Sequence, residues 1–521
     1  MDIPLTPLRF KRRAAQLYGR KTGVVCGELR FTYAEFSDRC DHLAGALQSM
    51  GMPQGSRVAF LSGNCHRLLE AYYGAVQAGG VLLPLNVRLS ADELAFILND
   101  SEAWTLFYES DFHPIVEKMR SRLSSVQRFI PLDRAVDDGW SSRETYEDLL
   151  ARAENFTPVA VHENDTAEIF YTSGTTADPR GVVLTHRNLY LHALSTIIAL
   201  GIRDTDVQLH VIPLFHVNGW GAPQSLTCMG GTHVMLRRFD PLRVLQLISE
   251  EGVTYSSFVP SMAHALLGQP GVSDFDYSSL RMLFLGGAAS SPELVRRIET
   301  VFKCRCHSGY GLTESSPILT IALPKSTVND VDDLDRTKRQ ATPGYPLVGV
   351  EIDIVDEQGK KLSHDGKSTG EILARSDGVM KCYWNRPGES AAALQDGWLH
   401  TGDVGSIDEE GCLRIVDRKK DIIISGGENI ASLEIEQRLY HHEAVLECAV
   451  IGVPDPRWGE VPKAFVVLRQ GCSVSEQELL AFCAQTLPSF KRPASIVFLD
   501  ALPKGGTGKI LKRELRRSSA G

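Results

Sequence analysis

The sequence predicts an α/β fold with a large N-terminal domain, in which parallel-type sheets are flanked by helices, and a small C-terminal α+β domain. Short apolar strand patterns alternate with helical patterns from the N-terminus onward, which is typical of parallel sheets. A chain of 521 residues is too long for one ordinary hydrophobic core. We therefore expect two or more domains.

The first elements follow this alternation. Thr32 and Glu35 form a capping-box pattern that predicts a helix start, and apolar residues continue at helical spacing to Met50. Residues 56–61 are predicted to form a buried strand, followed by a helix through 68–78 and a second strand at 79–84.

Further strands are predicted at 208–213 and 281–286, where apolar runs end in Gly, Pro or His. The carboxyl ends of such strands are where α/β folds bind ligands. Residues 321–340 are polar and predicted to be an exposed excursion. From Gly349 an alternating, Gly-punctuated pattern predicts a small antiparallel β subdomain to about residue 416.

The charge run 417–421 is consistent with an exposed linker, although composition alone does not locate a boundary there. The remaining residues predict a compact α/β unit. Its expected elements are a helix at 433–441, strands at 447–453 and 463–468, and a helix at 475–487.

Composition narrows the functional class. Lys+Arg 55 against Asp+Glu 64 gives a net charge of −9, which argues against a nucleic-acid-binding surface. Eleven scattered cysteines fit a reducing cytoplasm, and the Cys304-Arg-Cys306-His307 cluster lacks the second pair that a metal site needs. No apolar run approaches the roughly 20 residues of a membrane span, and no signal peptide opens the chain. We predict a cytoplasmic monomer or homodimer, with peripheral membrane contact left open.

The most informative segment is Tyr171-Thr-Ser-Gly-Thr-Thr-Ala-Asp-Pro-Arg-Gly181, which contains five hydroxyls, two glycines and a cation. Glycines let backbone N–H groups turn toward an anion, and Arg180 is suited to phosphate oxygens. Strand-like residues 167–170 and 181–185 flank the segment, and no Gly-Lys-Ser/Thr makes it a Walker loop. The alternative is a flexible surface loop; we favour ATP binding.

This segment resembles the phosphate loop of the acyl-adenylate-forming superfamily, which includes acyl-CoA synthetases, luciferases and peptide-synthetase adenylation domains. The chain is most similar to bacterial medium- and long-chain fatty acyl-CoA synthetases. Further matching motifs follow in the family's order over essentially the whole chain, at 212–220, 285–288, 309–314, 397–404, 416–421, 424–429 and 505–510. The resemblance implies an adenylate-forming domain at 1–419 and a mobile C-terminal domain at 420–521.

The resemblance implies an ATP site with Mg²⁺. It assigns the phosphates to Thr172, Ser173, Gly174, Thr175, Thr176 and Arg180, and adenine to Gly286, Gly287, Ala288, Ser308, Gly309, Tyr310 and Gly311. Thr313 and Glu314 match the family's contacts to the α-phosphate and Mg²⁺, for which a carboxylate is a suitable hard ligand. Asp403 matches the carboxylate that binds the ribose hydroxyls, with Arg418 beside it.

The C-terminal matches concern the two half-reactions. Lys509 matches the lysine that stabilises the phosphoryl group during adenylation, and Lys420 stands at the family's hinge, where a long exposed side chain tolerates rotation. Gly426, Gly427 and Glu428 match the segment that borders the pantetheine of coenzyme A. Two departures affect details, because Arg180 replaces the usual Lys and Ser308 replaces a frequent Gln.

The acyl site is implied by His216, Val217, Asn218 and Trp220, together with Gly311 and Leu312. His216 matches a residue beside the acyl carboxylate, and no Asp is present here to bind a substrate ammonium, which argues against an amino acid. Trp220 resembles a gate tryptophan of an acyl tunnel, and Gly219, Gly221 and Ala222 are expected to leave the indole room. A core tryptophan is the open alternative.

The resemblance implies an acid–CoA ligase that converts ATP, a carboxylic acid and coenzyme A to acyl-CoA, AMP and pyrophosphate through an acyl-adenylate. Medium- to long-chain fatty acids are the leading substrates, and an aryl or other small acid is the first alternative. The others are transfer of the acyl group to a carrier protein, and a non-catalytic nucleotide or CoA sensor. The presence of Thr313, Glu314, Asp403 and Lys509 argues against the sensor.

Overall fold

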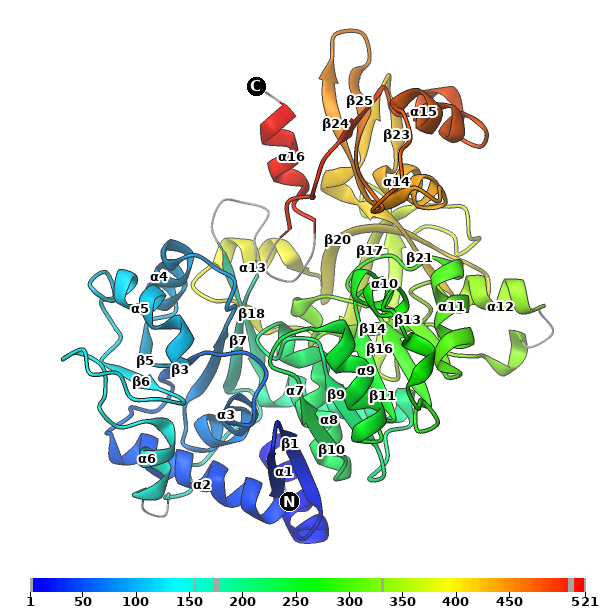
Figure 1. Ribbon diagram of the computed structural model, residues 1–521. Helices are drawn as coiled ribbons and strands as arrows, with labels where there is room; N and C mark the ends of the chain where they lie inside the picture. The colour runs from blue at the N-terminus through cyan, green and yellow to red at the C-terminus, as the bar shows by residue number, and fades with distance from the viewer. Residues whose placement is uncertain (1–2, 154–155, 173–178, 329–331, 505–509, 520–521) are drawn as a thin grey trace. The chain divides into compact units, whose positions relative to one another are not determined.

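The computed structural model describes residues 3–153, 156–172, 179–328, 332–504 and 510–519 (Figure 1). The chain forms two compact units. The first unit comprises residues 1–351 and 374–399, and the second comprises residues 352–373 and 400–521. The chain therefore crosses between the units within the β subdomain predicted from Gly349, and the boundary at 419/420 stays a prediction.

The first unit contains a seven-stranded sheet whose central strands are parallel. Its order is β18 (Cys382–Tyr383), β8 (Arg180–Thr185), β7 (Thr166–Thr172), β4 (Val81–Leu85), β3 (Arg57–Leu61), β5 (Ala103–Tyr108) and β6 (Arg128–Pro131). Helices α4 (Ala91–Asp100) and α5 (His113–Arg120) lie together beside this sheet (Figure 1). Leu98 and Val116 from these helices share a core with Leu83 and Leu106, which are fully buried. Burial of such apolar side chains is what holds helices on a sheet face.

A nine-stranded sheet forms the second core of this unit. Its order is β15 (Tyr345–Pro346), β14 (Ile318–Ile321), β13 (Arg305–Gly311), β12 (Met282–Leu285), β11 (Tyr255–Phe258), β9 (Val207–His210), β10 (Thr232–Met235), β1 (Thr22–Cys26) and β2 (Leu29–Thr32). Leu283 and Leu285 belong to the core of α9 (Pro241–Glu250), α10 (Pro260–Leu267) and α11 (Pro292–Phe302). Met282 and Phe284 alternate with them and join the core of α7 (His186–Leu200) and α8 (Val217–Met229).

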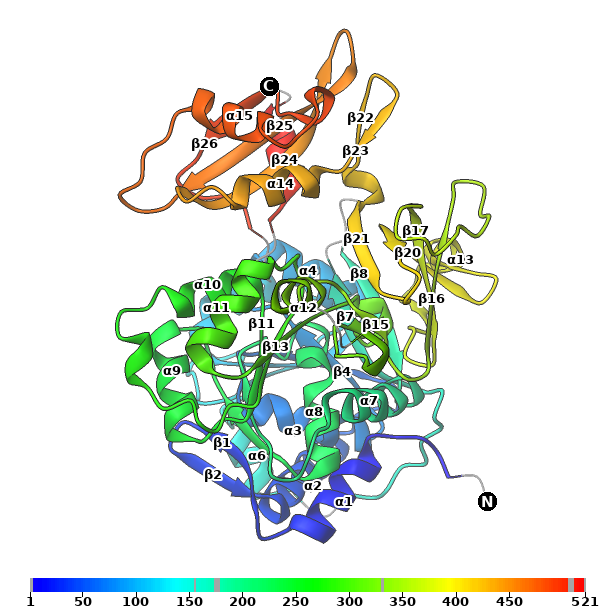
Figure 2. The ribbon, with the colours of Figure 1, turned by 90° about the vertical axis from the view of Figure 1, so that its right-hand side faces the viewer.

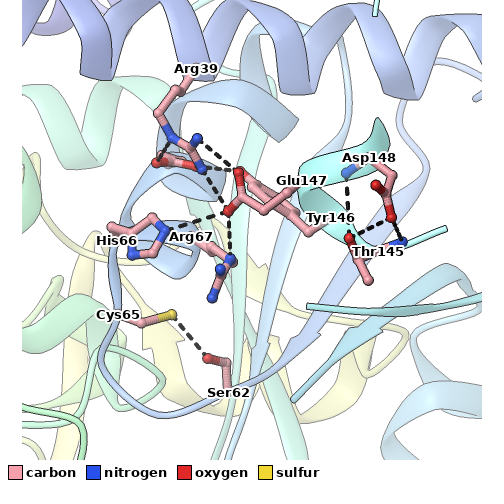
Figure 3. Close-up of polar contacts among 10 residues, drawn as sticks. Arg39, Ser62, Cys65, His66, Arg67, Thr145, Tyr146, Glu147 and Asp148 are labelled. Atoms are coloured by element: carbon pink, nitrogen blue, oxygen red, sulfur yellow. Dashed lines mark hydrogen bonds and ion pairs between the residues drawn. The ribbon is translucent and has the colours of Figure 1, made fainter. Parts of the chain in front are cut away.

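The N-terminal helices confirm the capping prediction. Thr32 accepts a hydrogen bond from the backbone of Glu35, whose side chain accepts one from Thr32, and α2 runs over Tyr33–Ser49. A partly buried polar network ties α2 to α3 (His66–Gln77) and α6 (Tyr146–Ala151) (Figure 3). Arg39 contacts Glu70 at 2.6 Å and Glu147 at 2.9 Å, and Tyr146 donates to Glu70 at 2.6 Å. Burial would raise the pKa of the Glu147 carboxyl, but His66 and the guanidinium groups of Arg39 and Arg67 together hold this pKa well below its usual range.

The prediction that residues 321–340 form an exposed excursion agrees with the described residues between 323 and 336, none of which is buried, and is wrong at both ends. Ile321 ends β14, and α12 (Asp333–Gln340) packs on α11 with Thr337 and Gln340 buried. The Gln340 amide donates to Glu299 Oε1 at 2.8 Å and to the Cys306 carbonyl at 3.2 Å. Both bonds satisfy the N–H groups of the Gln340 amide, whereas its Oε1 is buried with no hydrogen-bond partner among the described residues.

The second unit ends in a five-stranded sheet (Figure 2), and the two strands predicted at 447–453 and 463–468 correspond to two of its five strands. Its order is β23 (Glu428–Ile430), β22 (Ile423–Ser425), β25 (Gly459–Leu468) and β24 (Val445–Asp455), with β26 (Ser495–Phe498) on β25. Val450 and Val466 share a core with α14 (Ser432–Tyr440) and α15 (Glu476–Ala484), whereas Ile451 and Phe465 face Leu515 of α16 (Lys512–Ser519). The predicted antiparallel pairing also appears in β20 (Trp398–Ile407), which pairs with β19 (Leu394–Gln395) and β21 (Leu413–Arg418).

Within the described ranges, no helix has both the length and the apolar character needed to cross a membrane.

Candidate active site

The strands that flank the predicted phosphate loop are present as expected. Strands β7 and β8 pair antiparallel, and Thr172 and Arg180 stand opposite each other in the register. Ser173, Gly174, Thr175 and Thr176 lie outside the described residues, so their predicted role is untested. The Tyr171 hydroxyl donates to Asp100 Oδ2 at 2.6 Å. The end of β7 is therefore anchored to α4 directly before the loop.

Arg180 is held firmly at the other side of this loop. Its Nη1 contacts Glu389 Oε2 at 2.9 Å, and its guanidinium lies 4.5 Å from the centre of the Tyr383 ring. The side chain is only 18% exposed, and Nε is buried with no hydrogen-bond partner among the described residues. A buried N–H without a partner is unfavourable, and a phosphate oxygen is the kind of acceptor that would satisfy it.

Tyr383 connects this cation to the predicted magnesium ligand. Its hydroxyl donates to Glu314 Oε1 at 2.8 Å, while its ring lies under Arg180. Burial and the Glu314 carboxylate both raise the pKa of Tyr383 far above its ordinary value, so the phenol stays protonated and remains a donor. Position 383 carried no motif signal in the sequence.

Backbone pairing places Tyr383. Residues 382–383 form β18 on the edge strand β8, the Trp384 N–H donates to the Gly181 carbonyl at 2.7 Å, and the Met380 N–H donates to the Glu314 carbonyl at 2.8 Å. Thr313 is buried in the short 3₁₀ turn Thr313–Ser315. Residues more than 60 positions apart in the sequence thus share one polar cluster.

A single carboxylate beside a hydroxyl fits Mg²⁺. This ion is usually bound by one or two carboxylates while phosphates and water complete its octahedral shell. Among the residues that the structure describes, no group of three or more His, Cys, Asp or Glu side chains could form an all-protein metal site. Glu314 is therefore suited to a magnesium ion that arrives with a nucleotide.

The predicted adenine segments lie at the ends of two adjacent parallel strands. Leu285 of β12 is aligned with Ser308 of β13, which brings residues 286–288 next to 308–311. Gly287 has φ +76°, and Gly287 and Ala288 are exposed. Tyr310 is 9% exposed. This is the edge at which α/β folds bind ligands.

Several glycines here are required by packing within the protein. A Cβ at Gly309 would lie 2.5 Å from the Phe284 ring, and one at Gly311 would lie 1.8 Å from the Pro317 carbonyl oxygen. A Cβ at Gly286 would likewise lie 2.9 Å from the Trp220 indole. Ser308 is buried, and its hydroxyl has no hydrogen-bond partner within the described part of the chain.

Three of the predicted acyl residues lie in a left-handed turn at the start of α8, directly after His216, whereas Gly311 and Leu312 lie at the end of β13. Val217, Asn218 and Trp220 have φ of 34°, 44° and 63°. His216 is partly exposed, whereas the Trp220 indole is 9% exposed and meets the Phe284 ring edge to face at 5.8 Å.

The expectation that small neighbours leave the indole room stays a prediction, and the two glycines are themselves closely packed. A Cβ at Gly219 would meet the Leu214 side chain at 2.7 Å, and one at Gly221 would meet the His192 ring at 2.7 Å. The space beside both glycines is filled by other side chains. Glycine at these two positions allows both the left-handed backbone and the close packing of Leu214 and His192.

In the second unit, Asp403 and Arg418 stand opposite each other on β20 and β21, with Arg418 Nε 3.5 Å from Asp403 Oδ1. Asp403 is 6% exposed, and its N–H donates to the Thr401 hydroxyl at 3.2 Å. The pair offers a carboxylate acceptor beside a cation, as the sequence predicted. Lys509 lies outside the described residues.

The hinge and pantetheine segments also lie in the second unit. Lys420 lies in the 3₁₀ turn Lys419–Asp421 and is exposed, as predicted. The pKa of its ammonium is lowered by partial desolvation and, to a smaller extent, by the positive charge of Arg418. Gly426 and Gly427, with φ of 60° and 87°, form the two-residue turn between β22 and β23, which requires left-handed residues. Gly426 also packs against the Trp458 ring, and Glu428 is exposed.

Two family models match the chain. One, the AMP-binding enzyme model, covers residues 10–384, and the AMP-binding enzyme C-terminal domain model covers residues 434–509. The chain belongs to the AMP-binding enzyme family. This result confirms the predicted superfamily and α/β fold, and the predicted enzyme class, an AMP-forming acid–CoA ligase.

Relatives of this AMP-binding enzyme match along its full length. A long-chain-fatty-acid–CoA ligase of Thermus thermophilus is 37% identical over 524 residues, covering 99% of this chain and 96% of the relative. A peroxisomal butyrate–CoA ligase of Arabidopsis thaliana is 36% identical, covering 99% and 93%. The crystal structure of an anthranilate CoA ligase with anthranoyl-AMP superposes with a TM-score of 0.90 at 27% identity, covering 99% and 98%.

Proposed function

We propose that this AMP-binding enzyme activates a medium- to long-chain fatty acid with ATP and transfers the acyl group to coenzyme A. In the first half-reaction a carboxylate oxygen attacks the α-phosphorus, and the bond to pyrophosphate breaks. In the second, the thiol of coenzyme A attacks the acyl carbonyl, and AMP leaves. We expect this to occur in the cytoplasm.

The observation that supports a fatty acid is the apolar environment of Trp220. The indole belongs to a buried cluster with Ile212, Phe284 and Ile318, and Val217 of the same turn is also a member. An apolar wall gives favourable burial to an alkyl chain and offers no partner to a charged substituent. Relatives named for butyrate and for long-chain fatty acids are consistent with this substrate class.

An aryl acid is the second candidate. The benzoate–CoA ligase of Arabidopsis thaliana is 34% identical and covers the whole of this chain, and the anthranilate ligase superposes closely. The edge-to-face pair of Trp220 and Phe284 would suit a substrate ring as well as an alkyl chain.

The described residues support distinct roles in ATP binding. Arg180 is expected to bind phosphate oxygens through its unsatisfied Nε, and Asp403 to accept hydrogen bonds from the ribose hydroxyls. Glu314, oriented by Tyr383, would hold Mg²⁺, which neutralises charge on the phosphates when bound. Lys509 is proposed to stabilise the α-phosphoryl group during adenylation, and Lys420 to act as the hinge.

A substrate panel tests this proposal. Acids from two to eighteen carbons, together with benzoate and anthranilate, are assayed for AMP, pyrophosphate and thioester formation with and without coenzyme A. We expect the highest kcat/KM for a saturated acid of medium or long chain, with a thioester product. A maximum for an aromatic acid would replace the leading substrate by the second candidate. Pyrophosphate release without any thioester would contradict the CoA transfer.

A further inference from the structure

The left-handed turn that carries Trp220 is intrinsically unfavourable. Five consecutive residues, 217–221, have positive φ, and three of them are not glycine. A left-handed conformation costs L-residues about 1–2 kcal/mol each. Contacts outside the turn must therefore stabilise it.

A buried carboxyl group supplies two such contacts. Glu168 lies in β7 and is 1% exposed. Its Oε1 accepts a hydrogen bond from Gln224 Nε2 at 2.8 Å, and its Oε2 lies 3.5 Å from Asn218 Nδ2. One side chain of the seven-stranded sheet thus contacts both the turn and the helical residues that follow it.

Asn218 transmits this contact to the backbone of the turn. Its Oδ1 accepts a hydrogen bond from the Gly221 N–H at 2.6 Å, across the residue that carries the indole. The Ser225 hydroxyl donates to the Gly221 carbonyl at 2.9 Å. The backbone N–H and the carbonyl of Gly221 are therefore both hydrogen-bonded to side chains. Asn218, one of these side chains, in turn contacts Glu168.

The turn decides where the Trp220 indole lies. The ring contacts the backbone of Gly286 so closely that a Cβ there would be 2.9 Å from it, and its edge meets Phe284. Gly286 is the first residue after β12, beside the predicted adenine segments. A small rotation of the turn would move the indole relative to these residues.

We propose that Glu168 is a positioning residue of the acyl site, which holds Asn218 and Gln224 and so fixes the Trp220 indole that sets which acids are accepted. The acyl-site part of this inference rests on the proposed function. Burial raises the pKa of Glu168 to about 8, so the carboxyl is neutral at pH 7. A neutral acid serves as a hydrogen-bonding group in an apolar site without the cost of a buried charge.

The test compares Glu168→Leu, which removes the hydrogen bonds, with Glu168→Gln, which keeps a group that can bond Gln224 and Asn218. The matched control is Gln77→Leu, because Gln77 is a buried polar residue that bonds Cys40 and Asp41 instead. The measurements are kcat/KM for hexanoate and for dodecanoate, and the indole fluorescence of each substrate-free protein, with Trp220→Phe identifying the signal of Trp220.

We expect Glu168→Leu to change the ratio of the two kcat/KM values by at least about tenfold, comparable to one lost hydrogen bond. Glu168→Gln should restore the ratio to within about twofold of the wild type, because its amide oxygen can accept from Asn218 while its N–H donates to Gln224 Oε1, which lacks a partner among the described residues, once the Gln224 amide turns over. In a Trp220→Ala background, Glu168→Leu should produce no further change, because the two residues act through one group.

The proposal is overturned if Glu168→Leu lowers stability but leaves both the ratio and the Trp220 fluorescence unchanged, as we expect for Gln77→Leu. If Glu168→Leu does not fold, Gln224→Leu breaks the 2.8 Å bond with the carboxyl intact and should shift the ratio in the same direction. No shift in that variant overturns the proposal too. A wild type that forms no acyl-CoA refutes the proposed function, and the fluorescence then still decides whether Glu168 positions the indole.

Discussion

Among single residues, Tyr383 contacts both Arg180, which is predicted to bind phosphate, and Glu314, which is predicted to bind magnesium. The phenol joins the Arg180 guanidinium through its ring and the Glu314 carboxylate through its hydroxyl. A cation and an anion are thus held near one neutral group. Such preorganisation matters because charges that need not move when the reaction occurs stabilise its transition state most.

Tyr383→Phe removes the hydroxyl and keeps the ring under Arg180. We expect the rate of adenylation, measured by ATP–pyrophosphate exchange, to fall by roughly 10- to 100-fold. Hydrogen bonds to charged groups contribute about 1.5–3 kcal/mol. Thioester formation from supplied acyl-adenylate serves as the control and should be unchanged. An exchange rate equal to that of the wild type would contradict a role of the Tyr383 hydroxyl in adenylation.

Lys509→Ala tests the proposed adenylation lysine, which lies outside the described residues. We expect a loss of roughly 10²–10³-fold in adenylate formation, equivalent to about 2.7–4 kcal/mol for one transition-state donor. Formation of the thioester from supplied acyl-adenylate should continue. Equal damage to both half-reactions would contradict the assignment.

Glu168→Gln tests the protonation of the buried carboxyl. Because the pKa of Glu168 is raised from 4.5 to about 8 in the folded protein, the unfolded chain releases this proton first as pH rises. The free energy of unfolding should therefore fall between about pH 4.5 and pH 8 in the wild type, and this part of the fall should be absent in the variant. Urea titrations at pH 5, 6.5 and 8 measure it. Parallel pH profiles for the two proteins would show that Glu168 is ionised when folded; its nearby polar groups, Tyr72, Asn218 and Gln224, are unchanged in both proteins.

At the scale of elements, two left-handed turns mark the predicted binding segments. The turn between β22 and β23 uses two glycines, which adopt positive φ without steric strain. The turn at the start of α8 instead places Val217, Asn218 and Trp220 at positive φ. The second turn depends on tertiary contacts. A turn that needs such support is more informative about function than one that glycine makes freely.

Trp220→Ala distinguishes a gate from a core residue. If the indole limits the acyl site, the variant should favour longer or bulkier acids while its melting temperature stays near that of the wild type. If Trp220 serves packing alone, truncation should cost about 3–5 kcal/mol of stability and leave the relative kcat/KM values unchanged. A chain-length series and one melting curve separate the two results.

At the scale of the whole molecule, the chain contains two compact units and matches CoA ligases over nearly its full length. The residues implied in ATP binding are divided between the units: Glu314 and Arg180 belong to the first, and Asp403 and Arg418 to the second. A ligand that binds the folded protein raises its stability by mass action, so nucleotide binding can be measured on the complete enzyme.

Asp403→Ala should reduce the stabilisation of the complete enzyme by ATP. Loss of the acceptor for the ribose hydroxyls is expected to weaken ATP binding by about 1.5–3 kcal/mol, and hence to lower the ATP-dependent rise in melting temperature. The KM for the carboxylic acid should change much less. An unchanged KM for ATP would refute the role of Asp403.

Local patterns in the sequence predicted many of the elements and the family. The capping box at Thr32, the strands beside residues 171–181 and the order of the motifs all depend on residues that are close in the chain, and local hydrogen bonds and apolar periodicity record them. The family and the α/β fold could therefore be predicted, whereas the run 417–421, expected to be an exposed linker, contains the end of β21 at Arg418 and the buried residues Asp417 and Asp421.

The contacts between distant side chains could not be predicted from the sequence. Tyr383 reaches Glu314 because β18 adds to β8, and Glu168 reaches Asn218 because the turn of α8 packs against β7. The burial of Gln340 and the filled space beside Gly221 have the same origin. Such contacts join residues that are tens to hundreds of positions apart, and the energy that selects them comes from packing and satisfied hydrogen bonds, which leave no local pattern in the sequence.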